Sequence, residues 1–578
     1  MNLTPEQRAV GKENFVAALG SKKVRGDFLK KGIQQGIASG KGLGPYYFGY
    51  DKKIEKPVRV GVIGTGDEGC VLIGAINPAF VEVAAIADIR PYSVHRAFHG
   101  DHYSDSAAKV RPGLMAIYGW KTENEAREHV EVYADYRELI DKAKDDKLEA
   151  VIIALPLHLH AAAAIAAMKA GLHVLTEKLM GHSVHECKEM ARVAEETKLH
   201  LATGHQRHYS VFYDNAEHLI EKGLLGDIHY IRAQRHRGNL PGGDSWRQPM
   251  PESVKPKDDL AKKLSGELAS WERKLNEVTA KKNAKEIELW SKRVAQKKKQ
   301  IEDELIAEAV KGYGYEDVRI QADGKEVYGG PPIEELIRWR LFDRTGGGLM
   351  AELGSHQLDA ASIFISAMHE GKKQYPLNVM ASANRPLFPP DRDVDDHVYC
   401  LFEFPAPGYN ENDPYGKRKR ISVSYASING NGFGGYGETV FGTQGTLLLE
   451  REEEVLLFRG AAVDDKIRVV EDKNKKPSLV SQLDGDPGAA ALGAHALSGD
   501  PGRGYTEQIE HWAWCIRNPG PENQPHCHPK VALADAVIAL TVNLAAREGR
   551  RIDFKPEWFD PASDETPEGV KPDVSRYT

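Results

Sequence analysis

A glycine-rich turn near the beginning of the chain constrains the fold more than any other feature. The β-branched run at 58–63 leads directly into Gly64-Thr65-Gly66-Asp67-Glu68-Gly69, and a helix-like segment follows. A second strand-like run at 81–87 ends at Asp88. In such a layout the first glycine makes the tight turn, the second lets a diphosphate approach the backbone, and the third lets helix and strand pack closely. The turn therefore predicts a dinucleotide-binding strand–helix–strand unit.

The acidic residue after the second strand indicates which dinucleotide is bound. Asp88 is placed to accept hydrogen bonds from ribose hydroxyls, and its charge repels a 2′-phosphate. The sequence therefore favours NAD over NADP. Arg90, two residues later, keeps NADP as the less favoured alternative because an arginine is a partner for that phosphate.

Two kinds of strand pattern divide the chain. Strand candidates at 150–154 and 173–175 alternate with helix-like runs at 160–170 and 184–197, which predicts a Rossmann domain at 57–205 with a doubly wound parallel sheet. Beyond it, alternating runs such as 229–233, 398–402 and 421–425 predict an α+β domain at 206–550 with an open, mostly antiparallel sheet. A turn is expected at 442–446.

An insertion and two terminal segments complete this division. The Lys- and Glu-rich segment 255–311 carries apolar residues at heptad spacing, which predicts a helical arm within an insertion at 251–330. Residues 551–578 form a C-terminal tail, and residues 1–56 an N-terminal extension. Within the extension, 24–30 resembles a twin-arginine export signal in outline, but it has one arginine and a polar continuation. We expect it not to direct export; an exported ancestor is the alternative to a cytoplasmic protein.

Charge and cysteine usage exclude several classes of protein. The net charge of −7 is spread over both signs, which gives no reason to expect a nucleic-acid partner. No stretch approaches the roughly 20 apolar residues of a membrane helix, so no membrane partner is expected. The five cysteines are scattered and odd in number, which is typical neither of a disulfide framework nor of a paired zinc motif.

Three further motifs carry a family resemblance. They are Leu155-Pro156-Leu157-His158-Leu159-His160, Thr176-Glu177-Lys178, and the segment 346–359 with the sequence Gly-Gly-Gly-Leu-Met-Ala-Glu-Leu-Gly-Ser-His-Gln-Leu-Asp. In order and spacing they resemble the glucose–fructose oxidoreductase / inositol dehydrogenase / rhizopine-catabolism (Gfo/Idh/MocA) family over roughly 57–550. The resemblance implies NAD(P) at the domain interface, a sugar or sugar-like substrate against the open sheet, and a homo-oligomer, dimer or tetramer.

The resemblance also implies catalytic residues. The lysine of the family's Glu-Lys-Pro motif, which contacts nicotinamide and substrate, falls on Lys178, although Leu179 replaces the proline. The Asp-x-x-x-His pair of polyol dehydrogenases falls on Glu352 and His356. We expect His356 to be the general base, because the unperturbed pKa of histidine lies near neutrality. Glu352 either orients His356 or supports the structure.

The remaining predicted site residues follow from the same motifs. The cofactor-binding set is Gly64, Thr65, Gly66, Asp67, Glu68, Gly69, Asp88, Arg90, Leu155, Pro156, His158, His160, Glu177, Lys178 and His205. The substrate-binding set is Gln206, Arg207, Tyr209, Arg237, Trp246 and Asp359, with Arg235, His236 and Asn239 in the same polar cluster. No metal is predicted: His95, His99 and His102 lack a completing ligand, and 526–528 is better explained as a loop that begins a helix.

These residues leave three functions open. The first is an NAD-dependent oxidoreductase that acts on a secondary hydroxyl of a sugar, glycoside or cyclitol. The second is implied by the resemblance, because some members of that family are glycoside hydrolases that oxidise C3 transiently, eliminate the aglycone, add water and reduce the ketone again; His205, His208, His236 and His356 supply candidate bases. The third, a catalytically inactive sugar- or NAD-binding protein, would be favoured if Lys178 or His356 pointed away from the cofactor.

Overall fold

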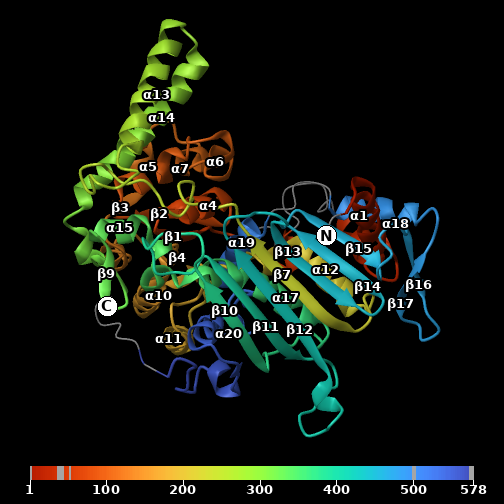
Figure 1. The fold of residues 1–578 in the computed structure, drawn as a ribbon. Helices are drawn as coiled ribbons and strands as arrows, with labels where there is room; N and C mark the ends of the chain where they lie inside the picture. The colour runs from red at the N-terminus through yellow and green to blue at the C-terminus, as the bar shows by residue number, and fades with distance from the viewer. Residues whose placement is uncertain (1–2, 35–43, 51–53, 498–502, 570, 572–578) are drawn as a thin grey trace.

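The computed structural model describes residues 3–34, 44–50, 54–497, 503–569 and 571. Two large sheets lie side by side, a parallel one built from the first part of the chain and a mixed one from the second (Figure 1). Parts of the predicted N-terminal extension and C-terminal tail fall outside the described residues. The predicted fold class, a Rossmann domain followed by an α+β domain with an open sheet, is confirmed.

The first sheet has six parallel strands in the order β3-β2-β1-β4-β5-β6. Its strands are β1 Val58–Ile63, β2 Val81–Ala87, β3 Glu131–Tyr133, β4 Ala150–Ile153, β5 His173–Thr176 and β6 Leu201–Thr203. One face packs against α9 Tyr136–Asp141, α10 His160–Lys169 and α11 Val184–Thr197, and the other against α4 Asp67–Ala75. Helices on both faces bury most of the sheet, which explains the apolar runs of β1, β2, β4 and β6, whereas the edge strand β3 stays partly exposed.

The second sheet has eight strands in the order β15-β14-β13-β7-β12-β11-β10-β18. The strands are β7 Ile228–His236, β10 Asn378–Asn384, β11 His397–Pro405, β12 Arg420–Ile428, β13 Tyr436–Gly442, β14 Gly445–Glu450, β15 Glu454–Arg459 and β18 Ile552–Asp553. Every neighbouring pair is antiparallel except β7 and β12. The inner face of the sheet packs against α12 Val211–Glu221 and α17 Ser355–Ala367, and the expected turn joins β13 to β14.

Two late helices connect the sheets. Trp512 of α19 Tyr505–Arg517 is fully buried in the core on the α4 side of the parallel sheet. The helix α20 Pro529–Glu548 contacts α11 on one side and β10 and α17 on the other. By length and composition α20 could cross a membrane, but most of it is buried inside the protein, as a core helix is. The late part of the chain therefore contributes to both cores.

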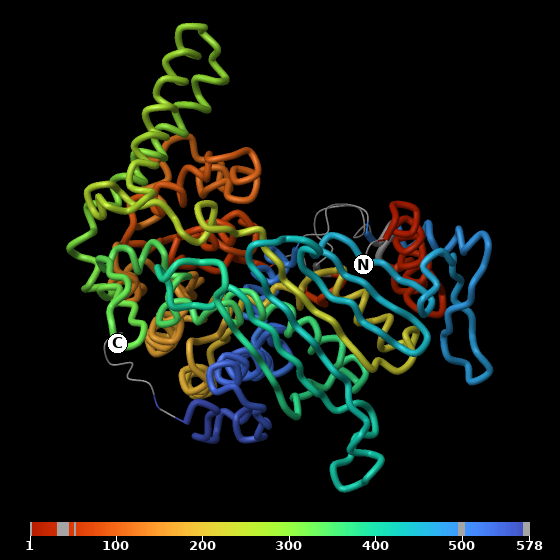
Figure 2. The backbone as a smooth tube through the Cα atoms, in the orientation of Figure 1, coloured from red at the N-terminus to blue at the C-terminus, as the bar shows by residue number. Residues whose placement is uncertain are grey.

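The insertion forms a helical arm. Helices α13 Lys263–Ala280 and α14 Ala284–Glu302 pack against each other as a hairpin that projects from the molecule (Figures 1 and 2). The predicted heptad stripe is its seam: Leu264 and Val278 are buried, and the rings of Trp271 and Trp290 meet edge to face with centroids 6.3 Å apart. The base of α14 packs on α5 Pro91–His99, next to the parallel sheet.

The N-terminal extension is folded rather than trailing. Helix α1 Pro5–Gly20 packs against β15 and α18 Pro487–Ala496, at the far end of the mixed sheet (Figure 1). The segment 24–30 enters helix α2 Gly26–Gln34, where Leu29 is buried and Arg25 forms an ion pair with Asp214 at 2.7 Å. The signal-like residues thus contribute to packing.

Candidate active site

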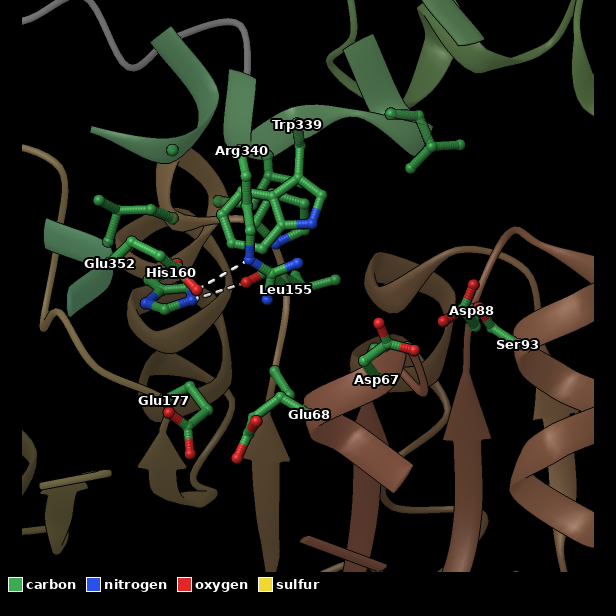
Figure 3. Close-up of a pocket in the computed structure, with 18 of the residues that line it drawn as sticks. Asp67, Glu68, Asp88, Ser93, Leu155, His160, Glu177, Trp339, Arg340 and Glu352 are labelled. Carbon is green, nitrogen blue, oxygen red and sulfur yellow. Dashed lines mark hydrogen bonds and ion pairs between the residues drawn. The ribbon is translucent and has the colours of Figure 1, made fainter. Parts of the chain in front are cut away.

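A cavity of about 510 Å³ lies where the carboxyl ends of the parallel strands meet the mixed sheet. This is the crevice in which open α/β sheets bind ligands. Fifteen residues predicted from the sequence line it (Figure 3 shows several): Gly64, Gly66, Asp67, Glu68, Asp88, Arg90, Leu155, Pro156, His160, Glu177, Lys178, Arg237, Trp246, Glu352 and His356.

The glycine turn has the geometry that a dinucleotide requires. Gly64 has φ +83°, and a Cβ there would lie 2.5 Å from the carbonyl oxygen of Ala154, the residue directly after β4. A Cβ on Gly69 would lie 2.0 Å from the carbonyl oxygen of Gly64, so α4 packs too closely on the turn for any side chain. Gly66, in contrast, faces open space toward the cavity. The turn therefore leaves room for a diphosphate at the beginning of α4.

Asp88 is held at the end of β2 by the same turn. Its Oδ2 accepts a hydrogen bond from the backbone N–H of Thr65 at 2.7 Å, and its Oδ1 accepts one from the backbone N–H of Arg90 at 2.9 Å. Thr65 itself is buried, and its backbone N–H holds the carboxylate of Asp88 in place at the cavity. Asp88 lines the cavity, so the residues present fit the adenosine ribose of a dinucleotide, with a carboxylate to meet its hydroxyls.

The insertion neutralises Arg90. The Nε and the terminal amino group of Arg90 both donate to Oδ2 of Asp303, at 2.9 and 2.8 Å, immediately after α14. Asp303 is fully buried and also accepts a hydrogen bond from the backbone N–H of Tyr92. Arg90 is thus committed to a carboxylate, and it is not free to meet a 2′-phosphate. Sequence reasoning could not find Asp303, because it lies far away along the chain in a segment with no recognisable motif.

Replacing Asp303 by asparagine is expected to weaken the discrimination against NADP by about tenfold. The amide keeps the side chain's size but removes the charge, so the guanidinium of Arg90 becomes available to a 2′-phosphate. Fluorescence titration with NADH and NADPH measures the ratio of the two dissociation constants without any substrate. Glu308→Gln, on the exposed surface nearby, is the matched control. An unchanged ratio in a folded Asp303→Asn protein would contradict the assignment.

The two acidic residues of the glycine turn point in different directions. Asp67 forms an ion pair with Arg96 at 2.6 Å. Burial raises the pKa of its carboxyl, but the charges of Arg96 and Arg111 lower it by more, so that the pKa lies below its ordinary value. Asp67 therefore stays ionised at the beginning of α4, and the positive charge of Arg96 compensates its negative charge. Glu68 lies on the same side of the cavity as Glu177, above the ends of the strands (Figure 3).

Glu177 is a buried carboxyl beside the catalytic candidates. Burial raises its pKa to about 8, and the charge of Glu68 contributes to the rise. One of its oxygens accepts a hydrogen bond from the backbone N–H of Lys178 at 3.1 Å, while Oε1 is buried without a partner among the described residues. Glu177 is therefore protonated at neutral pH and titrates in the range where catalytic acids and bases work.

Replacing Glu177 by glutamine is expected to flatten the pH dependence of stability. The unfolded chain loses this proton near the ordinary pKa of 4.5, whereas the folded protein keeps it up to about 8. Between these values the folded state binds more protons, so this group makes the free energy of unfolding fall as the pH rises. Melting temperatures at pH 5 to 8, without cofactor, should drop less steeply for Glu177→Gln than for the wild type. Parallel curves would contradict the raised pKa.

Lys178 and Glu352 are linked across the two domains. The Nζ of Lys178 donates to the backbone carbonyl of Glu352 at 2.6 Å, and the peptide bond from Lys178 to Leu179 is cis. Glu352 lies in a π-helical turn, Met350–Gly354, that leads into α17. Its carboxylate accepts from Arg340 Nε at 2.8 Å (Figure 3); burial raises the pKa of that carboxyl, but Arg340 and Lys178 bring it down to about 2. Glu352 therefore remains ionised, and it pairs with Arg340 rather than with His356.

His356 faces the cavity as a neutral imidazole. Burial holds its pKa well below 6.5, and the charges of Lys178, Arg207 and Arg235 lower it further. Its Nδ1 is buried and has no hydrogen-bond partner among the described residues. An uncharged histidine without a partner, beside a lysine, is able to accept a proton from a hydroxyl in this cavity.

Eight predicted residues do not line the cavity. Thr65 and Gly69 lie just behind it, in the glycine turn. His158 is buried against the ring of Tyr315, with centroids 5.4 Å apart. His205, Gln206, Arg207, Tyr209 and Asp359 are also buried away from it.

The segment 206–209 is structural for a local reason. After β6 the chain makes a 3₁₀ turn over Gln206–Tyr209, which directs these side chains into the protein. Arg207 forms an ion pair with Glu452 at 2.6 Å, and the hydroxyl of Tyr209 is hydrogen-bonded to Nδ1 of His511 at 2.8 Å. The structure therefore does not bring Gln206, Arg207 and Tyr209 to the cavity. The same holds for Asp359, whose Oδ1 is hydrogen-bonded to His208 at 2.9 Å.

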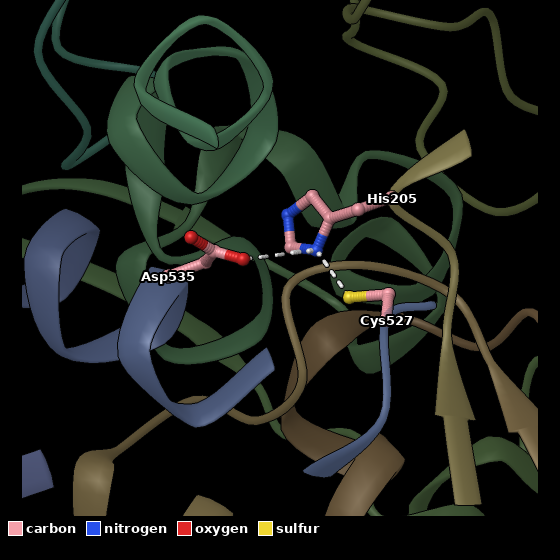
Figure 4. Close-up of side chains that lie close together, drawn as sticks. All are labelled: His205, Cys527 and Asp535. Atoms are coloured by element: carbon pink, nitrogen blue, oxygen red, sulfur yellow. Dashed lines mark hydrogen bonds and ion pairs between the residues drawn. The ribbon is translucent and has the colours of Figure 1, made fainter. Parts of the chain in front are cut away.

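His205 belongs to a buried polar cluster behind His356. Its Nδ1 lies 3.5 Å from Sγ of Cys527 and 4.0 Å from Oδ2 of Asp535 (Figure 4), and the rings of His205 and His356 are 6.2 Å apart. Burial lowers the pKa of His205 to about 3. Lys373 forms an ion pair with Asp535 at 2.5 Å and supplies the positive charge that this carboxylate needs. His205 thus supports His356 from behind instead of contacting the cavity.

The histidine motifs set aside in the sequence have ordinary partners. His99 is hydrogen-bonded to Glu123 at 2.8 Å, and His102 to the carbonyl of His99 at 2.9 Å. His528 begins α20, as expected for a loop that leads into a helix. Among the described residues, two groups are close enough to hold a metal ion, His205–Cys527–Asp535 and His208–Asp359–Asp535. Cys527 of the segment 526–528 belongs to the first group, whereas His95, His99, His102, His526 and His528 belong to neither.

Several lining residues escaped the sequence analysis because they come from distant segments. Tyr313 and Tyr315 belong to the insertion, Trp339 and Arg340 precede the glycine triplet, and Arg503 and Tyr505 lie before and at the beginning of α19. None of them belongs to a motif with a fixed spacing. Only the three-dimensional fold brings them to the carboxyl ends of the parallel strands.

Comparison with protein families identifies the first domain. Residues 58–205 match the model of the Gfo/Idh/MocA group, described as an oxidoreductase family with an NAD-binding Rossmann fold. The match covers β1 to β6, the glycine turn and Lys178.

Curated relatives of two kinds match the chain. A glycosyl hydrolase family 109 protein of Solibacter usitatus is 26% identical over 211 residues, which are 36% of this chain and 44% of the relative. An inositol 2-dehydrogenase of Corynebacterium glutamicum is 28% identical over 201 residues, 34% of this chain and 50% of the relative. The matches thus span about half the length of these relatives.

Solved structures show the same fold over most of the chain. An oxidoreductase domain protein from Kribbella flavida aligns with a TM-score of 0.50 and 14% identity over 86% of this chain and 100% of its own. An inositol dehydrogenase homologue from Azotobacter vinelandii, solved with NADH and myo-inositol, aligns with a TM-score of 0.50 and 14% identity over 87% of this chain and 99% of its own.

Proposed function

Because residues 58–205 match the Gfo/Idh/MocA oxidoreductase family, we propose that the protein is an NAD-dependent oxidoreductase acting on a secondary hydroxyl of a sugar, glycoside or cyclitol. The observation that carries the proposal is one cavity lined by Gly66 and Asp88 of the nucleotide-binding turn together with Lys178 and His356. An inactive binding protein is not favoured, because Lys178 and His356 both face this cavity.

The residues divide into a cofactor set and a reacting set. Gly64, Gly66, Asp88 and the beginning of α4 would hold the dinucleotide, which when bound accepts a hydride from the carbon that bears the hydroxyl. Lys178, fixed by its hydrogen bond to the carbonyl of Glu352, is placed to hold the hydroxyl oxygen. His356 accepts the hydroxyl proton as hydride leaves the carbon, so that a ketone forms. Trp246 offers an apolar face to a sugar ring.

A redox-assisted glycosidase is the second candidate. It is supported by the match to a family 109 relative and by Glu177, a carboxyl whose pKa of about 8 leaves it available as a further acid or base. In that reaction a base removes the proton next to the transient ketone, the aglycone leaves, water adds, and the ketone is reduced again. Hydrolysis then consumes no net NAD.

One experiment separates the two candidates. Purified protein is incubated with free sugars, cyclitols and aryl glycosides, with and without added NAD, and both NADH absorbance and aglycone release are recorded. Net NADH from a free sugar or cyclitol supports the dehydrogenase. Aglycone release without net NADH supports the glycosidase. If neither signal appears although NADH binds, the proposal of an active enzyme is wrong.

Assembly and location are proposed on separate grounds. We propose a homo-oligomer formed through the open face of the mixed sheet, where Met380, Tyr399 and Leu401 stand out on neighbouring strands at 46, 42 and 37% exposure. Light scattering measures its mass, and a monomer would contradict it.

The five cysteines are all free and buried, which supports a reducing, cytoplasmic location. Fractionation of the producing cells tests that location.

A further inference from the structure

Two arginines of the cavity form no ion pair within the part of the chain that the structure describes. Arg235, near the end of β7, and Arg237, just beyond it, are two residues apart and both line the cavity. Arg235 lies over the ring of Tyr436 at 4.7 Å and Arg237 over the ring of Trp246 at 5.5 Å. Among the described residues neither guanidinium forms an ion pair, and one terminal amino group of Arg235 is buried without a hydrogen-bond partner.

The other arginines near this end of the cavity are matched. Arg340 is paired with Glu352 at 2.8 Å, and Arg503 with Glu452 at 2.8 Å. Arg235 and Arg237, in contrast, are two like charges that disfavour each other: burial lowers the pKa of Arg237, and the neighbouring charge of Arg235 lowers it further. The charge of Glu352 opposes this shift, but its carboxylate is already paired with Arg340. Like charges held together out of water are costly unless an opposite charge compensates them. Such a pair is therefore typical of a site for an anion.

Their neighbours place this pair at the reacting end of the cavity. Arg235 is one of the charges that act on His356, and Arg237 is one of those that act on Glu352. The place prepared for the cofactor diphosphate is different, because it lies at Gly66 and the beginning of α4, near Asp67 and Arg96. An anion between Arg235 and Arg237 would consequently belong to the substrate.

We propose that Arg235 and Arg237 bind an anionic group, a carboxylate or a phosphate, of the sugar or cyclitol substrate. The inference rests on the proposed function and narrows it to acidic sugars. Trp246, stacked on Arg237, would hold the sugar ring while the two guanidinium groups hold the charge.

The test compares ligands that differ only in charge. The NADH-loaded protein is titrated by calorimetry with a methyl glucoside, the corresponding methyl glucuronide, its neutral methyl ester and glucose 6-phosphate, and with the same set in the galacto series. The acidic ligand should bind about 30-fold more tightly than the ester and the glucoside. Comparing the affinities of the glucuronide and of glucose 6-phosphate shows whether the arginines bind a carboxylate or a phosphate.

Variants then assign the preference to residues. Arg235→Met and Arg237→Met should each reduce the ratio of acidic to neutral affinity, and Arg273→Met, on the exposed face of the arm, should keep it. Melting curves verify folding, and Arg235→Gln and Arg237→Gln serve if the methionine variants unfold. If a neutral ligand binds as tightly as the acid, the inference is overturned. NADH formation from neutral sugars would still support the proposed function in that case. A preference that survives in both variants also overturns it. If no ligand binds or is oxidised, the proposed function fails as well.

Discussion

Replacing Lys178 by methionine is expected to lower kcat by about three orders of magnitude, within the range that positioned acid–base groups contribute. Lys178 lines the cavity, and its Nζ is fixed from the opposite domain by a hydrogen bond to the carbonyl of Glu352 at 2.6 Å. Methionine is similar in length but has no donor and no charge. The hydroxyl oxygen then loses the ammonium that steadies it as its proton leaves.

Two controls separate this effect from a loss of structure or cofactor. Lys169→Met, on the exposed end of α10, changes the same residue type outside the cavity and should keep its activity. NADH titration should show that the Lys178→Met protein still binds cofactor, because Gly66 and Asp88 are untouched. Steady-state rates with the best substrate of the panel give the comparison. A Lys178→Met enzyme within a few-fold of the wild-type kcat would show that Lys178 is not part of the chemistry.

Local patterns predicted the elements of the fold well. The strands at 58–63 and 81–87 and the helix at 184–197 are found with the predicted bounds, because apolar period and flanking turns are local signals. The arm was also predicted from its heptad stripe. The docking of α1 on β15, and the contribution of α19 to the Rossmann core, were not predicted, because they depend on contacts between distant segments.

The site was predictable only where a contiguous sequence motif carries it. The glycine turn, Asp88, Lys178 and His356 each belong to a contiguous motif, and all but two residues of that turn line the cavity. The structure does not bring the predicted residues of 206–209 to the cavity, because the end of a strand does not determine whether the next turn faces the cavity or the core. Asp303, Arg340 and Arg503 were missed because each acts through an ion pair with a residue elsewhere in the chain.

The protonation state in which His356 meets the substrate follows from its burial. Burial and the charge of Lys178 hold its pKa well below 6.5, so the imidazole is neutral at physiological pH and ready to accept a proton. The acid limb of the kcat/KM profile should therefore lie below pH 6.5. A histidine exposed to water would place that limb near its ordinary pKa.

Replacing His356 by alanine is expected to lower kcat by about 100-fold or more and to remove this acid limb. The change leaves a hole the size of an imidazole beside Lys178, so added imidazole should restore part of the rate, and the restored rate should follow the neutral form of the added base. His205→Ala removes the ring that packs behind His356 and leaves the proton acceptor in place, so added imidazole should not restore the activity of this variant. If the acid limb persists in His356→Ala and imidazole has no effect, the proton goes to another group, and Lys178 or Glu177 is the base.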